Sequence, residues 1–225
     1  MDFVYTASTW IAPVLIAITL HEAAHGYVAW RLGDDTAKRL GRVTFNPLRH
    51  VDPYGTIVIP ALLLSFSNFV FGWAKPVPVD FSRLERPRRD MVWVAAAGPA
   101  VNIALAAASA ALMHLVPLLP VTVELWVFEN LRNSIVINLV LAVFNLLPLP
   151  PLDGGRIAVG LLPLPLARPL ARMERFGLFV IIGVLFVLPY AGQEFGVDLN
   201  VFPWLIGEPV RFLMGVIAGL AGLAP

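Results

Sequence analysis

Long apolar stretches separated by short polar segments run through most of this chain. The first stretch predicts a helix from about residue 8 to residue 32, where a glycine and two aspartates form a stop signal. Similar stretches predict helices over about residues 88–116, 131–147, 175–190 and 202–223. This pattern indicates an all-α polytopic membrane protein with about five to six transmembrane helices.

The apolar segment 56–73 is predicted to re-enter the membrane and not to span it. Cationic residues concentrate on the cytoplasmic side of a membrane, and both flanks of this segment are rich in them. Those before it are Arg31, Lys38, Arg39, Arg42 and Arg49, and those after it are Lys75, Arg83, Arg86, Arg88 and Arg89. We therefore expect both of its ends, and the C-terminal end of the first helix, in the cytoplasm. A further cationic loop is expected over residues 156–175.

Two polar segments are predicted to be extended. Residues 41–47 form a strand-like run that ends in a turn. Residues 77–79 are flanked and interrupted by Pro76 and Pro78, which disfavour a helix and a central strand alike and favour an edge strand. We expect both to form short β segments, and the second could pair with an extended strand of another chain.

Composition agrees with a membrane protein: the chain is 58% hydrophobic and 14% charged, with a mean hydropathy of +0.78. We expect one membrane-embedded domain over residues 1–225, with its core over about 8–156 and C-terminal helices over about 172–223. The net charge of +1, without a basic stripe, argues against a nucleic-acid partner. The chain has no cysteine, so metal ligands must be His, Asp or Glu.

The strongest chemical signal is His21-Glu22-Ala23-Ala24-His25 within the first apolar stretch. Histidines four residues apart share one helix face and can bind one zinc ion, and the glutamate between them can act as a general base. The pattern also occurs by chance on solvated helices. In a membrane helix, however, each ionisable residue costs about 2.5–3.5 kcal/mol, so such residues persist mostly where they function.

A catalytic zinc site normally needs a third protein ligand. The candidates are His50, His114, Asp52, Asp90, Glu124, Glu129, Asp153 and Glu174. Most of them lie in loops or at helix ends, where a solvated charge is ordinary. Asp153 follows helix-breaking prolines and precedes Gly154 and Gly155, so its carboxylate could face the interior. It could equally be the N-cap of the next helix.

Three motifs resemble the signatures of site-2 proteases, which are intramembrane zinc metalloproteases. They are HEAAH at 21–25, AGPAVN at 97–102 and NLLPLPPLDGG at 145–155, in the family's order. GWAKPVPV at 72–79 and NPLRHVDPYGT at 46–56 further resemble a compact branch that lacks a PDZ or CBS domain. The likeness extends from Leu20 to Arg156, and the C-terminal helices are placed by hydropathy alone.

This resemblance implies one Zn²⁺ per chain, with His21, His25 and Asp153 as metal ligands and Glu22 as the catalytic residue. It also implies that Asn145 helps to bind the substrate or polarise its scissile carbonyl, and that Asn102 assists from the neighbouring helix. The alternative for both asparagines is a structural hydrogen bond between helices, worth about 0.6 kcal/mol on average.

The implied function is intramembrane hydrolysis of peptide bonds within or near the transmembrane segments of membrane protein substrates, which makes residues 8–156 the catalytic core. The short β segments would then lie near the active site, where the second could pair with an unwound substrate strand. The implied location is the lipid bilayer of a prokaryotic cell membrane, with an active site that opens to the cytoplasmic side. A membrane metal-ion transporter is one alternative, but it should carry a second set of ligands along a path. A noncatalytic scaffold that binds membrane proteins is another, but it would not need Glu22.

Overall fold

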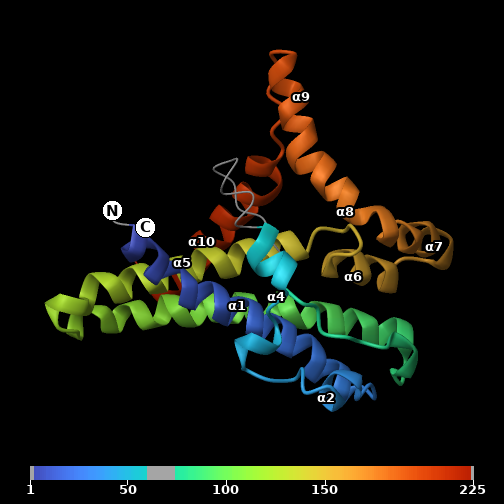
Figure 1. Cartoon of the computed structure of the whole chain (residues 1–225), viewed down its shortest axis with the longest axis horizontal. Coiled ribbons are helices and arrows are strands. Elements are labelled where there is room, and N and C mark those ends of the chain that lie inside the picture. The colour runs from blue at the N-terminus through green and yellow to red at the C-terminus, as the bar shows by residue number, and fades with distance from the viewer. Residues whose placement is uncertain (1–2, 60–73, 224–225) are drawn as a thin grey trace.

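The computed structural model describes residues 3–59 and 74–223, and its core is a bundle of three long helices (Figure 1). These helices are α1 (Phe3–Arg31), α4 (Pro87–Leu112) and α5 (Val121–Asn145). A 3₁₀ segment, Met113–Leu118, and a short turn join α4 to α5. The fold-class prediction is confirmed, because all regular structure in the described residues is helical.

Small and polar side chains let the three helices approach closely. Ala106 and Ala110 on α4 are fully buried, as small residues at membrane helix interfaces commonly are. Hydroxyl groups of Ser109 on α4 and Ser134 on α5 are hydrogen-bonded at 2.8 Å. Asn133 on α5 donates to the backbone carbonyl of Thr9 on α1 at 3.1 Å. In lipid, the hydrophobic effect does not drive helices together, because the surrounding acyl chains are as apolar as the helices. These polar contacts therefore help to fix the relative position of the three helices.

The C-terminal helices extend this bundle. Helix α10 (Glu208–Ala221) packs on α4 and α5 in the larger apolar core, to which it contributes Val210 and Ile217. It is preceded by a π-helical turn, Pro203–Gly207. Helices α8 (Glu174–Ile182) and α9 (Leu188–Glu194), joined by the π-helical segment Gly183–Val187, project away from α1, α4 and α5 (Figure 1).

In the described part of the chain, five helical stretches are long and apolar enough to cross a membrane: Val4–Arg31, Pro87–Leu118, Val121–Asn145, Glu174–Glu194 and Pro203–Ala221. This number agrees with the five to six predicted from hydropathy, and the chain is a multi-pass membrane protein. The helices predicted over 88–116, 175–190 and 202–223 begin close to the expected residues. Helix α5, in contrast, starts about ten residues before the predicted residue 131, because Glu124, Glu129 and Arg132 do not interrupt it.

Three local predictions are wrong. The expected loop 156–175 is mostly helical, in α6 (Asp153–Leu161) and α7 (Leu164–Arg172). Residues 41–47 form turns and bends, and residues 74–80 carry no regular structure, so neither segment is a strand. Extended backbone becomes a strand only when a neighbouring strand pairs with it, and the described residues supply none. Most of segment 56–73, predicted to re-enter the membrane, lies outside the described residues.

The described residues between α1 and α4 form short elements. They are α2 (Thr36–Arg39), the 3₁₀ turns Pro47–Arg49 and Phe81–Arg83, and the π-helical turn Pro53–Val58. Gly33 has a φ of 110°, which favours glycine at the point where α1 ends. The backbone N–H of Glu85 donates to the Leu32 carbonyl at 3.0 Å. The end of α1 and the start of α4 are therefore adjacent.

Asp34 joins these loops as a buried acceptor. It is fully buried and accepts hydrogen bonds from the backbone N–H and hydroxyl of Thr36 and from the backbone N–H of Asp80, the last at 2.7 Å. Burial raises the pKa of its carboxyl, but these hydrogen bonds and the nearby charge of Arg83 outweigh that effect and hold the pKa below its usual value. The ionised carboxylate thus connects the end of α1 to the segment that precedes α4.

Candidate metal centre

Ligand atoms from three side chains converge where α1, α4 and α6 meet. The Nε2 atoms of His21 and His25 are 3.1 Å apart, and each lies 3.3 Å from Oδ2 of Asp153. The two histidines are one turn apart on α1, while Asp153 comes from the first turn of α6, 128 residues after His25 in the chain. All three side chains are buried. Within residues 3–59 and 74–223, they are the only such group of three.

In His21 and His25, the hydrogen bond at Nδ1 determines whether Nε2 carries a hydrogen or a free lone pair toward the cluster. His25 Nδ1 lies 2.7 Å from the backbone carbonyl of Val94, which can only accept, so Nδ1 carries the hydrogen. His21 Nδ1 lies 2.5 Å from Oδ1 of Asn102. The amide nitrogen of Asn102 donates to Asn138 Oδ1 at 2.8 Å, which leaves its oxygen to accept from His21. In the neutral rings both Nε2 atoms therefore point their lone pairs into the cluster.

This arrangement fits a zinc ion. Two buried imidazole lone pairs and a carboxylate oxygen that lacks a hydrogen-bond partner repel one another unless a cation lies between them. In a tetrahedral site with bonds of about 2.1 Å, neighbouring ligand atoms are about 3.4 Å apart, close to the separations found here. Two imidazoles and one carboxylate are also the ligand set of several catalytic zinc sites, with one position left for water or substrate.

Gly98 on α4 makes room for the cluster. A Cβ atom at this position would lie 2.5 Å from His25 Nε2 and 2.6 Å from His21 Nε2. The backbone of α4 therefore passes directly beside the converging atoms, and any larger residue would occupy the space that a metal needs. The sequence pattern alone indicates no role for Gly98, although this residue lies in the AGPAVN motif. Its importance depends on how closely α4 packs on α1, which spacing along the chain does not reveal.

Asp153 is not the N-cap of α6 in the structure. The N-cap of α6 is Leu152, without a side-chain capping bond, and Asp153 is the first helical residue. Its carboxylate points to the histidines and does not cap the helix. Gly154 and Gly155 permit the tight turn before α6, because a Cβ at either would lie 2.1 Å from backbone atoms of residues 146 and 150. This turn aims the carboxylate at α1.

Glu22 is tied to the segment that precedes α4. Its Oε2 accepts a hydrogen bond from the backbone N–H of Val77 at 2.7 Å. The same segment is fixed from the other side by the Arg42 guanidinium, which donates to the Lys75 carbonyl at 2.7 Å. Residues 74–80 thus lie along the HEAAH turn of α1, as expected for a segment near the active site, although they form no strand.

The two asparagines occupy different positions. Asn102 is fully buried between His21 and Asn138, with both ends of its amide hydrogen-bonded inside the protein. Asn145 lies at the C-terminal end of α5, where its amide donates to the Leu141 carbonyl of its own helix at 2.9 Å. For Asn102 the geometry favours the structural alternative, a bond between helices that orients His21.

The other third-ligand candidates with assigned contacts are engaged elsewhere. Asp90 accepts from the Arg86 backbone and His114 contacts the Ala221 carbonyl. Further pairs are His50 with the Thr44 carbonyl, Asp52 with the N–H groups of Tyr54 and Gly55, Glu129 with Arg132, and Glu174 with Arg156. Asp153 is therefore the candidate that joins the histidines.

Comparison with known proteins agrees with this geometry. The model of peptidase family M50 matches residues 120–188. "Putative zinc metalloprotease YwhC" of Bacillus subtilis is 42% identical over 194 residues, which cover 84% of this chain and 85% of that protein. The chain belongs to peptidase family M50. "Putative zinc metalloprotease Rip2" of Mycolicibacterium smegmatis is 31% identical over 193 residues, which cover 82% of this chain and 69% of that protein. "Putative zinc metalloprotease Rip2" of Mycobacterium tuberculosis H37Rv is 33% identical over 188 residues, which cover 83% of this chain and 70% of that protein.

No solved structure matches this M50 peptidase. Its family membership confirms the resemblance to site-2 proteases, and it makes the protein a zinc-dependent protease. A metal-ion transporter and a noncatalytic scaffold are thereby disfavoured.

Proposed function

We propose that this M50 peptidase hydrolyses peptide bonds within or near the transmembrane segments of membrane protein substrates, from a single membrane-embedded domain over residues 1–225. The observation that carries the proposal is the convergence of two histidines and an aspartate midway along a helix long enough to span the bilayer. His21 lies about 15 Å from the cytoplasmic end of α1 at 1.5 Å per residue, near half the depth of a ~30 Å core.

In this proposal, His21, His25 and Asp153 hold one zinc ion, and Glu22 is the catalytic base. The zinc, when bound, polarises the scissile carbonyl and lowers the pKa of an attacking water. Glu22 takes a proton from that water and passes it to the leaving amine. The Val77 N–H occupies Oε2 of Glu22, which leaves Oε1 for this proton and holds the carboxylate in place.

A helical substrate must unwind before its carbonyl can be attacked. We place the unwound strand along residues 74–79, whose backbone lies beside Glu22, with Asn145 contributing a contact to the substrate. Unsatisfied backbone groups of an extended segment can pair with a second strand, which supplies affinity through the main chain. The basic loops on either side of this segment support entry of water from the cytoplasmic side.

The Glu22→Gln variant tests the catalytic role. Purified wild type and variant should each hold one zinc per chain, because Glu22 is not in the ligand set. Co-expression with a panel of single-span membrane proteins, followed by mass spectrometry of the products, should show cleavage by wild type alone. Glu129→Gln, at the opposite end of the bundle, is the matched control and should cleave normally. Cleavage by Glu22→Gln would overturn the assignment.

The ligand role of Asp153 is tested separately. Asn and Ser are good helix caps, so Asp153→Asn and Asp153→Ser would retain zinc and activity if Asp153 only stabilised α6. We expect both variants to lose zinc, measured by elemental analysis of the purified protein, while their helical circular dichroism stays unchanged. Full zinc content in either variant would remove Asp153 from the ligand set.

A further inference from the structure

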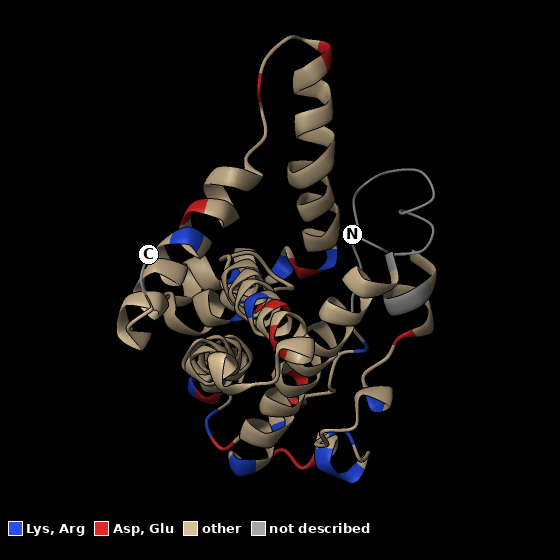
Figure 2. Ribbon diagram, turned by 90° about the vertical axis from the view of Figure 1, so that its left-hand side faces the viewer, with Lys and Arg blue, Asp and Glu red and all other residues tan. Residues whose placement is uncertain are grey.

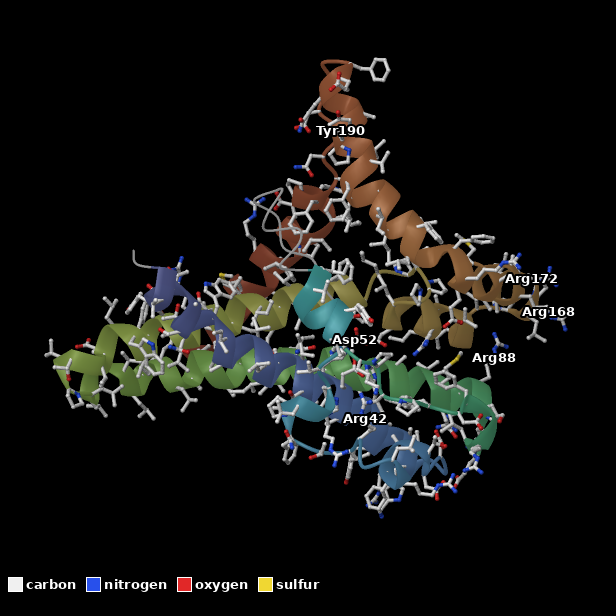
Figure 3. The ribbon with its side chains drawn as sticks, viewed as in Figure 1. Arg42, Asp52, Arg88, Arg168, Arg172 and Tyr190 are labelled. Atoms are coloured by element: carbon white, nitrogen blue, oxygen red, sulfur yellow. The ribbon has the colours of Figure 1, made fainter. Side chains whose placement is uncertain are left out.

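A cationic cavity lies beside the segment that contacts Glu22. Its volume is about 510 Å³, and its walls are Leu40, Arg42, Leu48, Arg49, Val51, Lys75, Pro76 and Pro78. Three cations and no acidic residue line it. Arg42, which Figure 3 labels beside α1, comes from the loop after α2. Arg49 ends the 3₁₀ turn Pro47–Arg49, and Lys75 lies in the segment 74–80, whose Lys75 carbonyl accepts a hydrogen bond from Arg42.

Within residues 3–59 and 74–223, no carboxylate pairs with the cations of this cavity. Neither Arg49 nor Lys75 forms an ion pair in the described part of the chain. Arg42 is 8% exposed, and its buried Nε–H has no hydrogen-bond partner, although its terminal nitrogen donates to two backbone carbonyls. A buried guanidinium is costly without a counter-charge, and an anion bound in the cavity beside Arg42 would supply one.

The rim of the cavity is apolar and faces outward. Leu40 and Leu48, both in its wall, are 59% and 78% exposed, and the nearby Phe45 is 79% exposed. Such side chains beside basic residues are typical of a surface that lies in a membrane interface. Basic residues gather at this end of the molecule, around α2, in the lower part of Figure 2.

A second, apolar cavity of about 290 Å³ adjoins the same loop. It is lined by Phe45 and Pro47 from the loop and by Leu15, Ile16, Thr19 and Leu20 from α1. Pro47 directly precedes Leu48 and Arg49 in the wall of the cationic cavity. The loop therefore presents a basic site for an anion and an apolar surface for a hydrocarbon chain next to each other.

We propose that the cationic cavity binds the phosphate of an anionic phospholipid, with an acyl chain along Phe45, Pro47 and α1. Two guanidinium groups and an ammonium group suit a phosphate, and the exposed leucines favour a lipid over a soluble phosphate. A lipid held here would stabilise the loop at residues 42 and 75, next to the Val77 contact with Glu22. The argument for this site does not rest on the proposed proteolysis, although Lys75, Pro76 and Pro78 also belong to the segment proposed to lie along the substrate.

Native mass spectrometry of the purified zinc-loaded protein tests the proposal. The protein in detergent is mixed with equal amounts of phosphatidylglycerol and phosphatidylcholine that carry the same acyl chains. We expect wild type to retain phosphatidylglycerol in preference to phosphatidylcholine. Arg49→Gln and Lys75→Gln should each weaken this retention about fivefold, the factor expected for one cation at an anionic membrane surface.

Arg168→Gln and Arg172→Gln are the matched controls, because they remove the same charge from exposed positions on α7, away from Arg42 (Figure 3). They should retain the lipid as wild type does. Equal retention by all variants, or an equal loss in the α7 variants, would overturn the proposal. Inorganic phosphate in tenfold excess is a further arm: if it abolishes the preference for phosphatidylglycerol, the site takes free phosphate and the lipid assignment is wrong.

Discussion

Asn102 accepts a hydrogen bond from Nδ1 of His21 across the interface between α4 and α1. The bond holds the imidazole in the form that turns Nε2 toward His25 and Asp153. Asn102 is itself oriented by Asn138, whose amide donates to the Ser134 carbonyl at 2.8 Å. A chain of buried polar groups therefore positions one proposed zinc ligand from the neighbouring helices, and such partners commonly decide how tightly a metal is held.

Replacing Asn102 with alanine should weaken zinc binding about 10–100-fold, because His21 loses the acceptor that fixes its ring. Competition with a chromophoric chelator in detergent measures the affinity directly. Asn133→Ala is the matched control: it removes an asparagine bond between α5 and α1 away from the metal cluster, and its zinc affinity should be unchanged. Wild-type affinity in Asn102→Ala would show that the bond is only structural.

Gly98→Ala should prevent zinc binding. The new methyl group would lie 2.5–2.6 Å from the Nε2 atoms of His25 and His21, where it would displace the metal or push α4 away from α1. Overpacking of this kind costs about 1–3 kcal/mol, enough to distort a site without unfolding the bundle. Elemental analysis should find little zinc in this variant and one ion per chain in Gly219→Ala, a helical glycine with no neighbour within 4 Å. Equal zinc in both would contradict the close packing.

The sequence predicts the parts of this site that depend on local periodicity. Two histidines four residues apart must share a face of α1, and the apolar context places them in a membrane helix. Asp153 lies far along the chain, and the pattern leaves its role open until the turn before α6 is seen. Gly98 and Asn102 act through the packing of α4 on α1, which depends on distances between helices and not on spacing within one.

Element boundaries show the same limit. The polar residues Glu124, Glu129 and Arg132 suggest that the helix before Asn145 begins near residue 131, yet α5 begins at Val121. A helix continues past the apolar stretch as long as its backbone bonds can form, and here the start is set by Pro120 after the turn from α4. Likewise, the arginines between 156 and 175 predict a loop, but they are compatible with the exposed faces of α6 and α7.

The contribution of Asp34 to stability should depend on pH. Its pKa in the folded protein is lower than in the unfolded chain, so the stabilisation is fully present above the unfolded value of about 3.9 and is lost as the pH falls through the folded value. The difference in thermal unfolding midpoint between wild type and Asp34→Asn should therefore be largest near neutral pH and shrink in acid. Asp198→Asn, at an exposed loop position, is the control for the removal of one carboxylate. A constant difference across pH would contradict this account.

The last prediction concerns the topology of residues 56–73, and it rests on parity. The end of α1 and the start of α4 lie together, because the Glu85 N–H is bonded to the Leu32 carbonyl. His25 on α1 faces Val94 on α4 and His21 faces Asn102, so the two helices are antiparallel. Residues 33–84 must therefore leave and return on one side of the membrane, which a single crossing by 56–73 would not allow. We expect this segment to enter and leave on the cytoplasmic side.

Single cysteines can test this arrangement cleanly, because the chain has none. Each is introduced in turn and labelled in intact cells with a thiol reagent that does not cross the membrane. A cysteine at Arg83 should remain unlabelled until the cells are opened, whereas one at Val121, at the far end of the bundle from the C-terminal end of α1, should react in intact cells. Labelling near Ser65 to Asn68 from outside, with none at Arg83, would indicate a hairpin that reaches across the bilayer. External labelling at Arg83 would refute the cytoplasmic placement of both flanks and, with it, the opening of the active site to the cytoplasm.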